Sequence, residues 1–195
     1  MTRLILASGS EIRQQILRNA GIGFDVQMSG VDEDAIKQKW SGGDPADLAL
    51  QLAEAKAGAV SKGNEGLILA ADQILSLEGR LYDKAKSTDE ARDRLLMLRG
   101  KPHTLHSGLV AVRNGQTIWR HKQDSHLSVR EFTDSFLDQY LTSAGDELTK
   151  SVGAYAYEGF GAQLFEHVDG DYYAILGLPL LPVLSLLRDE GVIPV

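Results

Sequence analysis

Apolar residues occur along this chain in short continuous runs and in short alternating stretches. The run Leu4–Ala7 and the longer run Leu67–Leu77, which a few polar residues interrupt, predict buried strands. Phe24–Met28 alternates between apolar and polar residues and predicts a second strand. Leu164–Val168, followed by Asp169-Gly170, predicts another strand and turn. Strands are therefore expected at well separated points of the chain.

A hairpin is expected near the middle of the sequence. Asn114-Gly115 is a dipeptide typical of two-residue hairpin turns, and it separates Leu109–Val112 from Thr117–Trp119. These two flanking segments should pair as antiparallel strands. The sheet is therefore expected to be mixed rather than entirely parallel.

Helical spacing of apolar residues fills the intervals between the strands. The expected helices have capping residues at their starts or glycines at their ends. They run from a Ser8/Glu11 capping box to Gly21, from Asp44-Pro45 to near Gly63, from a Ser87/Glu90 capping box to Gly100, from Thr133 to Ala144, and from Pro179 or Pro182 to near Gly191. Strands that alternate with helices predict an α/β fold.

The composition is that of an ordinary globular protein. The chain has 195 residues, 43% hydrophobic and 24% charged, so we expect a single domain over residues 1–195. It has no cysteine, which excludes disulfides, thiolate zinc sites and cysteine nucleophiles. The net charge of −7 disfavours a nucleic-acid polymer as partner but allows a small anion held by local cations. No apolar run approaches the ~20 residues of a membrane span, so we expect a cytoplasmic protein without a membrane partner.

The turn Ser8-Gly9-Ser10 joins the first expected strand to the first expected helix. Small residues at a helix N-terminus expose free N–H groups and the positive end of the helix dipole, which together can cradle a phosphate. Arg13 could add a bidentate grip on the same anion. A capped turn followed by a solvated arginine accounts for the same residues, so the local pattern leaves both interpretations open.

Charged residues interrupt the apolar pattern at several other positions. Asp72 lies inside the run Leu67–Leu77, where a carboxylate is costly unless it is paired or binds a metal. The alternative is a strand-end aspartate that caps or pairs with a neighbour. Lys56 lies on the inner side of an alanine-rich helix and Lys84 follows a strand and turn, although each alone also fits a solvated lysine. Asp32-Glu33-Asp34 fits either a solvated acidic loop or part of a cation site.

Glycines, aromatic residues and one carboxylate, Glu158, are concentrated in residues 153–161. The aromatic faces of Tyr155, Tyr157 or Phe160 could stack on a nucleobase, and a carboxylate could accept hydrogen bonds from ring N–H groups. A glycine-rich turn that places aromatic residues in the core is the alternative.

Several common catalytic motifs are absent from the sequence. There is no Walker A loop, no Gly-x-Ser-x-Gly elbow and no His-Glu-x-x-His motif. His103 and His106 lack the spacing of a zinc site and have no carboxylate spaced with them, so we assign the histidines to structure or surface.

The candidate residues belong to a longer ordered set of short segments. These are Leu6-Ala7-Ser8-Gly9-Ser10-x-x-Arg13, Asp32-Glu33, Leu52-Ala53-x-x-Lys56-Ala57, Ala71-Asp72, Lys84, Ser107-Gly108, Gly153-Ala154-Tyr155, Glu158-Gly159-x-Gly161 and Gly177-Leu178-Pro179-Leu180. Together they resemble the Maf family of nucleoside triphosphate pyrophosphatases, once described as septum-formation inhibitors. The resemblance extends from Leu4 to about Leu187, and the ordered set is more specific than any one segment.

The resemblance implies an elongated mixed twisted sheet flanked by helices, with two lobes around a central cleft, as in Maf and ITPase-like proteins. It implies cleavage of a nucleoside triphosphate to monophosphate and pyrophosphate at the α–β phosphoanhydride, with Mg²⁺ or Mn²⁺ as cofactor. Asp72 would be catalytic, either as general base or as a metal ligand together with Glu33. The implied substrate-binding residues are Ser8, Arg13, Lys56, Lys84 and Glu158.

The chain departs from the family pattern at four places. Glu11-Ile12-Arg13 stands where many members have Pro-Arg-Arg, which removes one expected phosphate contact, and Asp83-Lys84-Ala85 replaces Gly-Lys-Pro. Asp72-Gln73 replaces Asp-Thr, and Glu158-Gly159 replaces Gln-Gly. The last two changes resemble the subgroup that favours 7-methylguanosine triphosphate (7-methyl-GTP). The alternatives are a dTTP/UTP pyrophosphatase of the same family and a non-catalytic nucleotide-binding regulator of septum formation, and a homodimer is left open.

Overall fold

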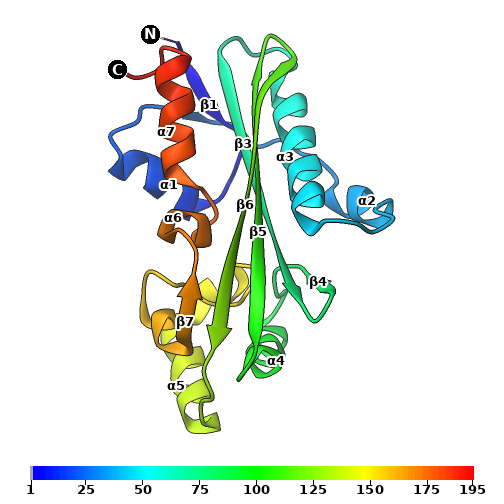
Figure 1. Cartoon of the computed structure of the whole chain (residues 1–195), viewed down its shortest axis with the longest axis vertical. Coiled ribbons are helices and arrows are strands. Elements are labelled where there is room, and N and C mark those ends of the chain that lie inside the picture. Colours follow the sequence, from blue (N-terminus) through cyan, green and yellow to red (C-terminus); the bar gives the residue numbers. More distant parts are fainter. Residues whose placement is uncertain (1) are drawn as a thin grey trace.

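The computed structural model describes residues 2–195, which form an elongated molecule built on one seven-stranded sheet. Figure 1 shows the sheet along the long axis, with both chain termini at the same end. The strands are β1 (Leu4–Leu6), β2 (Asp25–Val26), β3 (Leu67–Leu77), β4 (Arg80–Tyr82), β5 (Pro102–Arg113), β6 (Gln116–Val129) and β7 (Phe165–Asp169). The helices are α1 (Glu11–Asn19), α2 (Glu33–Gln38), α3 (Pro45–Ser61), α4 (Thr88–Leu98), α5 (Asp134–Ala144), α6 (Tyr172–Ile175) and α7 (Leu180–Asp189), with short 3₁₀ helices η1 (Gly145–Thr149) and η2 (Phe160–Leu164).

The sheet is mixed, as the sequence predicts. Its strand order is β2-β1-β3-β5-β6-β7, and β4 pairs with the end of β3. β1 is parallel to β2 and β3, whereas β5 is antiparallel to β3 and β6, and β6 to β7. The Asn114-Gly115 hairpin is confirmed, and both of its residues have positive φ. β5 and β6 extend far beyond the predicted segments 109–112 and 117–119, whereas β2 covers only two residues of the predicted Phe24–Met28.

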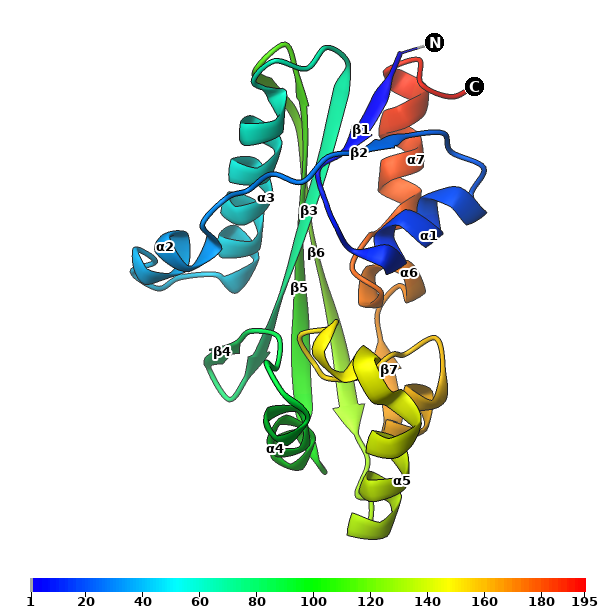
Figure 2. The same cartoon turned by 180° about the vertical axis from the view of Figure 1, so that it is seen from behind.

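Helices cover both faces of the upper half of the sheet. α3 lies on one face, and α1 and α7 lie on the other (Figures 1 and 2). Buried alanines along α3 allow it to approach the sheet closely. A Cβ atom at Gly108 of β5 would overlap the backbone of Ala49 and Leu50, so glycine at this position allows α3 to lie directly on the strand. This packing brings Lys56 of α3 to within hydrogen-bonding distance of β3.

Separate apolar cores define an upper and a lower lobe, and the upper lobe has a core on each face of the sheet. Alternate residues of β3 from Leu67 to Ala71 pack in the upper core with α1 and α7. Leu75 and Leu77 of the same strand pack in the lower core with α4 and α5. Asp72 and Gln73 therefore lie on β3 at the junction between the lobes. The polar interruption seen in the sequence marks this junction.

The predicted helices are present, with Asp44 and Ser87 as the N-caps of α3 and α4. The predicted capping box of Ser8 and Glu11 is wrong, because Glu11 is already the first residue of α1 and the N-cap is Ser10. Ser10 makes no side-chain capping bond. The hydroxyl of Ser8 does not cap α1. It lines the cavity described below, where Arg13 donates a hydrogen bond to it.

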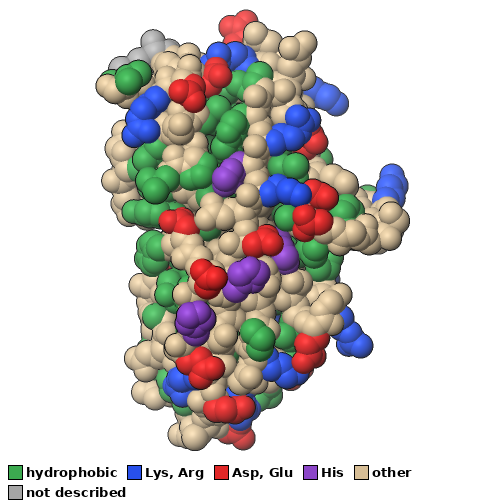
Figure 3. Space-filling view, viewed as in Figure 1, with side chains coloured by type: hydrophobic (Ala, Val, Ile, Leu, Met, Phe, Trp, Pro, Cys, Tyr) green, Lys and Arg blue, Asp and Glu red, His purple; other side chains and the backbone are tan. Residues whose placement is uncertain are grey.

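Acidic and basic side chains are interspersed over the face shown in Figure 3, without a broad area of one sign. Ion pairs join many of the charges on the surface of the molecule, among them Lys122 with Asp44 and Asp47, and Arg120 with Glu54. Over residues 2–195, none of the helices has the length and apolar character needed to cross a membrane.

Candidate active site

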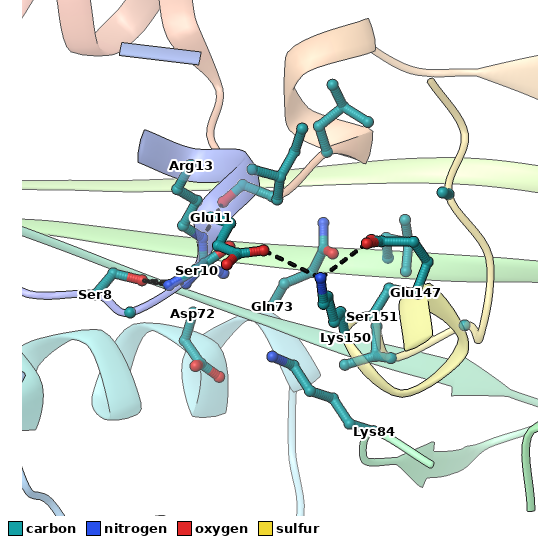
Figure 4. A pocket seen from close by; sticks show the side chains of 18 of the residues that line it. Ser8, Ser10, Glu11, Arg13, Asp72, Gln73, Lys84, Glu147, Lys150 and Ser151 are labelled. Atoms are coloured by element: carbon teal, nitrogen blue, oxygen red, sulfur yellow. Dashed lines mark hydrogen bonds and ion pairs between the residues drawn. The ribbon is translucent and has the colours of Figure 1, made fainter. Parts of the chain in front are cut away.

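A cavity of about 550 Å³ opens where the edge of the sheet is interrupted. β1 pairs with β3 as far as Leu69, and β4 begins to pair at Leu75, so Asp72 and Gln73 lie on an uncovered stretch of strand edge. Residues of both lobes line this space, and Figure 4 shows the side chains that converge on it. The charged lining residues are Glu11, Arg13, Glu33, Lys56, Asp72, Lys84, Glu147, Lys150 and Glu158.

Asp72 and Lys56 form a buried ion pair in the wall of the cavity. The Nζ atom of Lys56 lies 2.5 Å from Oδ1 of Asp72 and 2.9 Å from Oε1 of Glu33. Lys56 comes from α3 and Asp72 from β3, while Glu33 is the first residue of α2, where the sequence had predicted either a solvated loop or a cation ligand. Two carboxylates from different elements therefore converge on one ammonium group. This pairing explains how a carboxylate is tolerated in an apolar strand.

Glu33 is held in its ionised form by its neighbours. Burial alone would raise the pKa of Glu33, but the hydrogen bond and charge of Lys56, with the charges of Lys37 and Lys84, lower it below its ordinary value. Its carboxylate is therefore an acceptor at neutral pH.

Arg13 reaches from α1 to the open edge of β3. Its Nη1 donates to the carbonyl of Ala71 at 2.7 Å and to Oγ of Ser8 at 3.2 Å, and its Nε donates to the carbonyl of Gly177 at 2.8 Å. Burial lowers the pKa of Arg13, and the negative charge of Asp72 opposes that change. The guanidinium is thus a fixed positive charge beside the N-terminus of α1.

Lys84 points into the cavity from the segment between β4 and α4 (Figure 4). Within the described part of the chain, no side-chain hydrogen bond or ion pair holds its ammonium group. Burial lowers the pKa of Lys84, and the positive charge of Arg13 lowers it further. A cation without a protein partner in a half-enclosed space is suited to an anionic ligand.

Lys150 extends over the cavity from the lower lobe, a position that the sequence did not indicate. Its Nζ lies 3.1 Å from Oε2 of Glu11 and 2.8 Å from Oε1 of Glu147, the contacts drawn in Figure 4. Glu11 begins α1 in the upper lobe, whereas Glu147 lies in η1, whose Leu148 packs in the lower core. The contact of Lys150 with Glu11 therefore joins the two lobes. No periodicity or motif around Lys150 distinguishes it from a surface lysine.

The glycine-rich segment forms a further wall of the cavity. Tyr155, Tyr157 and Glu158 line it, whereas Phe160 packs among core aromatic residues and does not. A Cβ atom at Gly153 would overlap the ring of Tyr155, so this glycine allows the loop to fold over that ring. Glu158 is exposed, and no hydrogen bond or ion pair within residues 2–195 involves its carboxylate.

The buried histidines have structural contacts. Nε2 of His103 lies 2.7 Å from the hydroxyl of Tyr155, and burial lowers the pKa of His103 to about 4. His106 lies between the hydroxyl of Ser76 and the carboxylate of Asp124. His103 therefore supports the wall that carries Tyr155, in agreement with the structural role expected from the sequence.

Glu33 and Asp72 are the residues suited to hold a divalent cation. Their carboxylates converge on the point taken by the ammonium of Lys56. Mg²⁺ is commonly bound by one or two carboxylates, with water and substrate phosphates completing its shell. In the portion of the chain that the structure describes, no group of three or more His, Asp or Glu residues could hold a metal. These two carboxylates could therefore supply only part of the coordination shell of a cation.

All the site residues selected from the sequence line this one cavity, although they come from distant parts of the chain. They are Ser8, Arg13, Glu33, Lys56, Asp72, Lys84 and Glu158. The sequence did not single out Glu147 and Lys150, and it assigned Glu11 to a cap. The individual chemical roles stay predictions.

Comparison with known proteins adds three findings. A family model described as Maf-like protein matches residues 3–190. A nucleoside triphosphate pyrophosphatase of Maricaulis maris is 57% identical over 194 residues, 99% of each chain, and a 7-methyl-GTP pyrophosphatase of Rhizobium meliloti is 46% identical over 193 residues, 97% of each chain. Among solved structures, a HAM1 protein from Coxiella burnetii has a TM-score of 0.40 at 17% identity, covering 66% of this chain and 73% of that one. The last likeness is too distant to support an argument about function.

Proposed function

The chain belongs to the Maf family, and on that premise we propose that it is a nucleoside triphosphate pyrophosphatase that prefers 7-methyl-GTP. It would hydrolyse the α–β phosphoanhydride to nucleoside monophosphate and pyrophosphate. The observation that carries the proposal is a buried carboxylate, Asp72, in one cavity with Arg13, Lys56 and Lys84, beside the N-terminus of α1.

The start of α1, Lys84 and Arg13 would bind the polyphosphate. The N–H groups at this helix start and the ammonium of Lys84 can donate to phosphate oxygens in the same space. Arg13 is already fixed by main-chain carbonyls, so its charge needs no reorganisation when the substrate arrives. These groups would also stabilise the negative charge that develops on the departing pyrophosphate.

Asp72 would orient the attacking water and accept its proton. Its Oδ1 is fixed by Lys56, whereas no group in residues 2–195 donates a side-chain hydrogen bond to Oδ2. A carboxylate held in this way can align a water with the α-phosphorus and act as general base. The bond between the α-phosphorus and the bridging oxygen then breaks, and pyrophosphate leaves toward the cations.

The proposed cofactor is Mg²⁺ or Mn²⁺, held by Glu33 and Asp72. When bound, such a cation neutralises charge on the phosphates. The family resemblance assigns Lys56 to the phosphates, and its ammonium lies between these two carboxylates in the cavity wall. The convergence of the two carboxylates supports this part of the proposal.

Glu158 supports the preference for a guanine base. An ionised glutamate only accepts hydrogen bonds, so it fits the N1–H and N2–H₂ groups of guanine and is mismatched to a uracil carbonyl. Methylation at N7 makes the base cationic, which favours a nearby carboxylate and stacking on Tyr155 or Tyr157. The relative named 7-methyl-GTP pyrophosphatase agrees with this preference, whereas the name of the Maricaulis maris relative specifies no base.

The test is a panel of 7-methyl-GTP, GTP, dTTP and UTP, with kcat/KM and the identity of the released phosphate measured for each. We expect pyrophosphate as the product and 7-methyl-GTP as the best substrate. Glu158→Gln should narrow the preference over UTP by roughly 1 kcal/mol, the low end for a mismatched hydrogen bond, because Glu158 is exposed. Glu166→Gln, an exposed change in β7 outside the cavity, is the control. Release of orthophosphate, or no turnover, would contradict the activity. A wild-type preference for dTTP or UTP would contradict the proposed base preference and the role of Glu158, but not the pyrophosphatase activity.

A further inference from the structure

The cavity lining carries more carboxylates than cations, which is unfavourable for a triphosphate. Its carboxylates are Glu11, Glu33, Asp72, Glu147 and Glu158, and its cations are Arg13, Lys56, Lys84 and Lys150. The cations differ in how freely they could contact a ligand. Lys56 is held by two carboxylates at 2.5 and 2.9 Å, and Arg13 donates to two main-chain carbonyls. Only Lys84 and Lys150 have side chains that could turn to a phosphate without breaking a buried contact.

The contacts of Lys150 are all exposed to water. Its side chain is 47% exposed, and those of Glu11 and Glu147 are 79% and 50% exposed. Exposed ion pairs of this kind contribute little to stability, because water solvates both partners well after they separate. The hydrogen bonds and charges of Glu147 and Glu11 also raise the pKa of Lys150, so the side chain is charged throughout the physiological range. Lys150 is therefore a full positive charge that can change partners at small cost.

The ion pair with Glu11 holds Lys150 at the start of α1, the helix proposed to bind phosphate. Glu11 is the first residue of α1, so the ammonium of Lys150 is held by a side chain of the helix start that is proposed to cradle a phosphate, and both residues line the same cavity. A phosphate there carries more charge than one carboxylate and offers several strong acceptors. It would compete with Glu11 for Lys150 at the place where the side chain already lies.

We propose that Lys150 is a further substrate-binding residue, held across the cavity by Glu11 and Glu147 when no nucleotide is bound and transferred to the polyphosphate when nucleotide binds. This inference rests on the proposed pyrophosphatase function. Because Lys150 belongs to the lower lobe and Glu11 to the upper lobe, the transfer converts a contact between the lobes into one between the lower lobe and the substrate.

The first test replaces Lys150 by methionine and measures KM for the best triphosphate, together with the inhibition constant of inorganic pyrophosphate. We expect both constants to rise about tenfold, the low end for a hydrogen bond to a charged group, because the site is exposed. Lys122→Met is a matched control, since Lys122 also lies between two exposed carboxylates, at 3.0 Å from Asp44 and 2.6 Å from Asp47, but outside the cavity. It should leave both constants unchanged.

A second test separates direct contact from simple masking of the charge on Glu11. In the Glu11→Gln background, Lys150→Met should still raise KM about tenfold if Lys150 contacts the phosphates. If Lys150 only neutralises Glu11, the double variant should return to the wild-type KM, and the inference is overturned. It is also overturned if Lys150→Met alone changes neither constant in an active enzyme. A wild-type protein that releases no pyrophosphate refutes the proposed function directly, and this inference falls with it.

Discussion

Replacement of Lys56 by methionine should destabilise the protein through the two carboxylates that it leaves behind. Lys56 and Asp72 are only 9% and 8% exposed, so removal of the ammonium leaves a buried charge without its partner. Breaking a buried pair in this way typically costs about 3–5 kcal/mol. We expect the lower value, about 3 kcal/mol, because the side chain of Glu33 is 40% exposed and remains partly solvated. In a chain of this size that corresponds to a fall in Tm of about 6–12 °C.

The assay is thermal unfolding of wild type and Lys56→Met, with and without millimolar Mg²⁺. If Glu33 and Asp72 hold a divalent cation, Mg²⁺ should raise the Tm of the variant more than that of wild type, because in the variant no ammonium competes for the carboxylates. Lys122→Met, which loses only exposed ion pairs, should stay within about 2 °C of wild type. A Lys56→Met protein as stable as this control would refute the argument about the buried pair. Equal effects of Mg²⁺ on variant and wild type would refute the proposed cation site.

Three further changes test other parts of the account. Burial and the charge of Arg13 lower the pKa of Lys84, so Lys84 should lose its proton, and kcat/KM should fall, at a pH below 10.5, the ordinary pKa of lysine. Lys84→Arg should move this loss of activity to higher pH. An unchanged pH profile in the variant would count against Lys84 as a phosphate contact. Burial lowers the pKa of His103 to about 4 in the folded protein, whereas its pKa in the unfolded chain is about 6.5. Between these two pH values the unfolded state binds more protons than the folded state. About 3 kcal/mol of stability should therefore be lost as the pH falls from 6.5 to 4. Urea denaturation should show a weaker acid dependence in His103→Gln, and equal slopes would contradict this. Gly108→Ala should cost about 1–3 kcal/mol by the same method, because its Cβ overlaps the backbone of α3 at Leu50; wild-type stability would contradict the close packing.

Segments whose apolar pattern is set by burial on both faces were predicted well. β3 has the predicted bounds Leu67–Leu77, and α3 begins at the predicted Asp44 cap. β6 was underestimated because much of it is a polar strand with alternate residues exposed, and its conformation depends on pairing with β5. β5 is an exception among the buried strands: its first half contains the polar residues Thr104, His106 and Ser107, so only its apolar second half was predicted. α2 has no buried residue, so no apolar periodicity could indicate it.

The candidate site was predicted as separate residues but not as an arrangement. Asp72 was identifiable because it interrupts an apolar strand. Its partner Lys56 was only one lysine among many until α3 was placed on the sheet, which brings the two charges to 2.5 Å. The contact between Lys150 and Glu11 spans 139 residues and joins exposed side chains, so neither local pattern nor burial could reveal it.

Turnover by Asp72→Asn is the most direct test of the claim that the carboxylate at the open edge of β3 carries the hydrolysis. Asparagine has nearly the same shape and can still accept a hydrogen bond from Lys56, which keeps Glu33 as its charged partner. Pyrophosphate release from saturating 7-methyl-GTP should fall by roughly 10²–10⁴-fold, the usual loss when a general base is removed, while the variant stays folded and still binds inorganic pyrophosphate. A folded Asp72→Asn protein that releases pyrophosphate at nearly the wild-type rate would contradict the account.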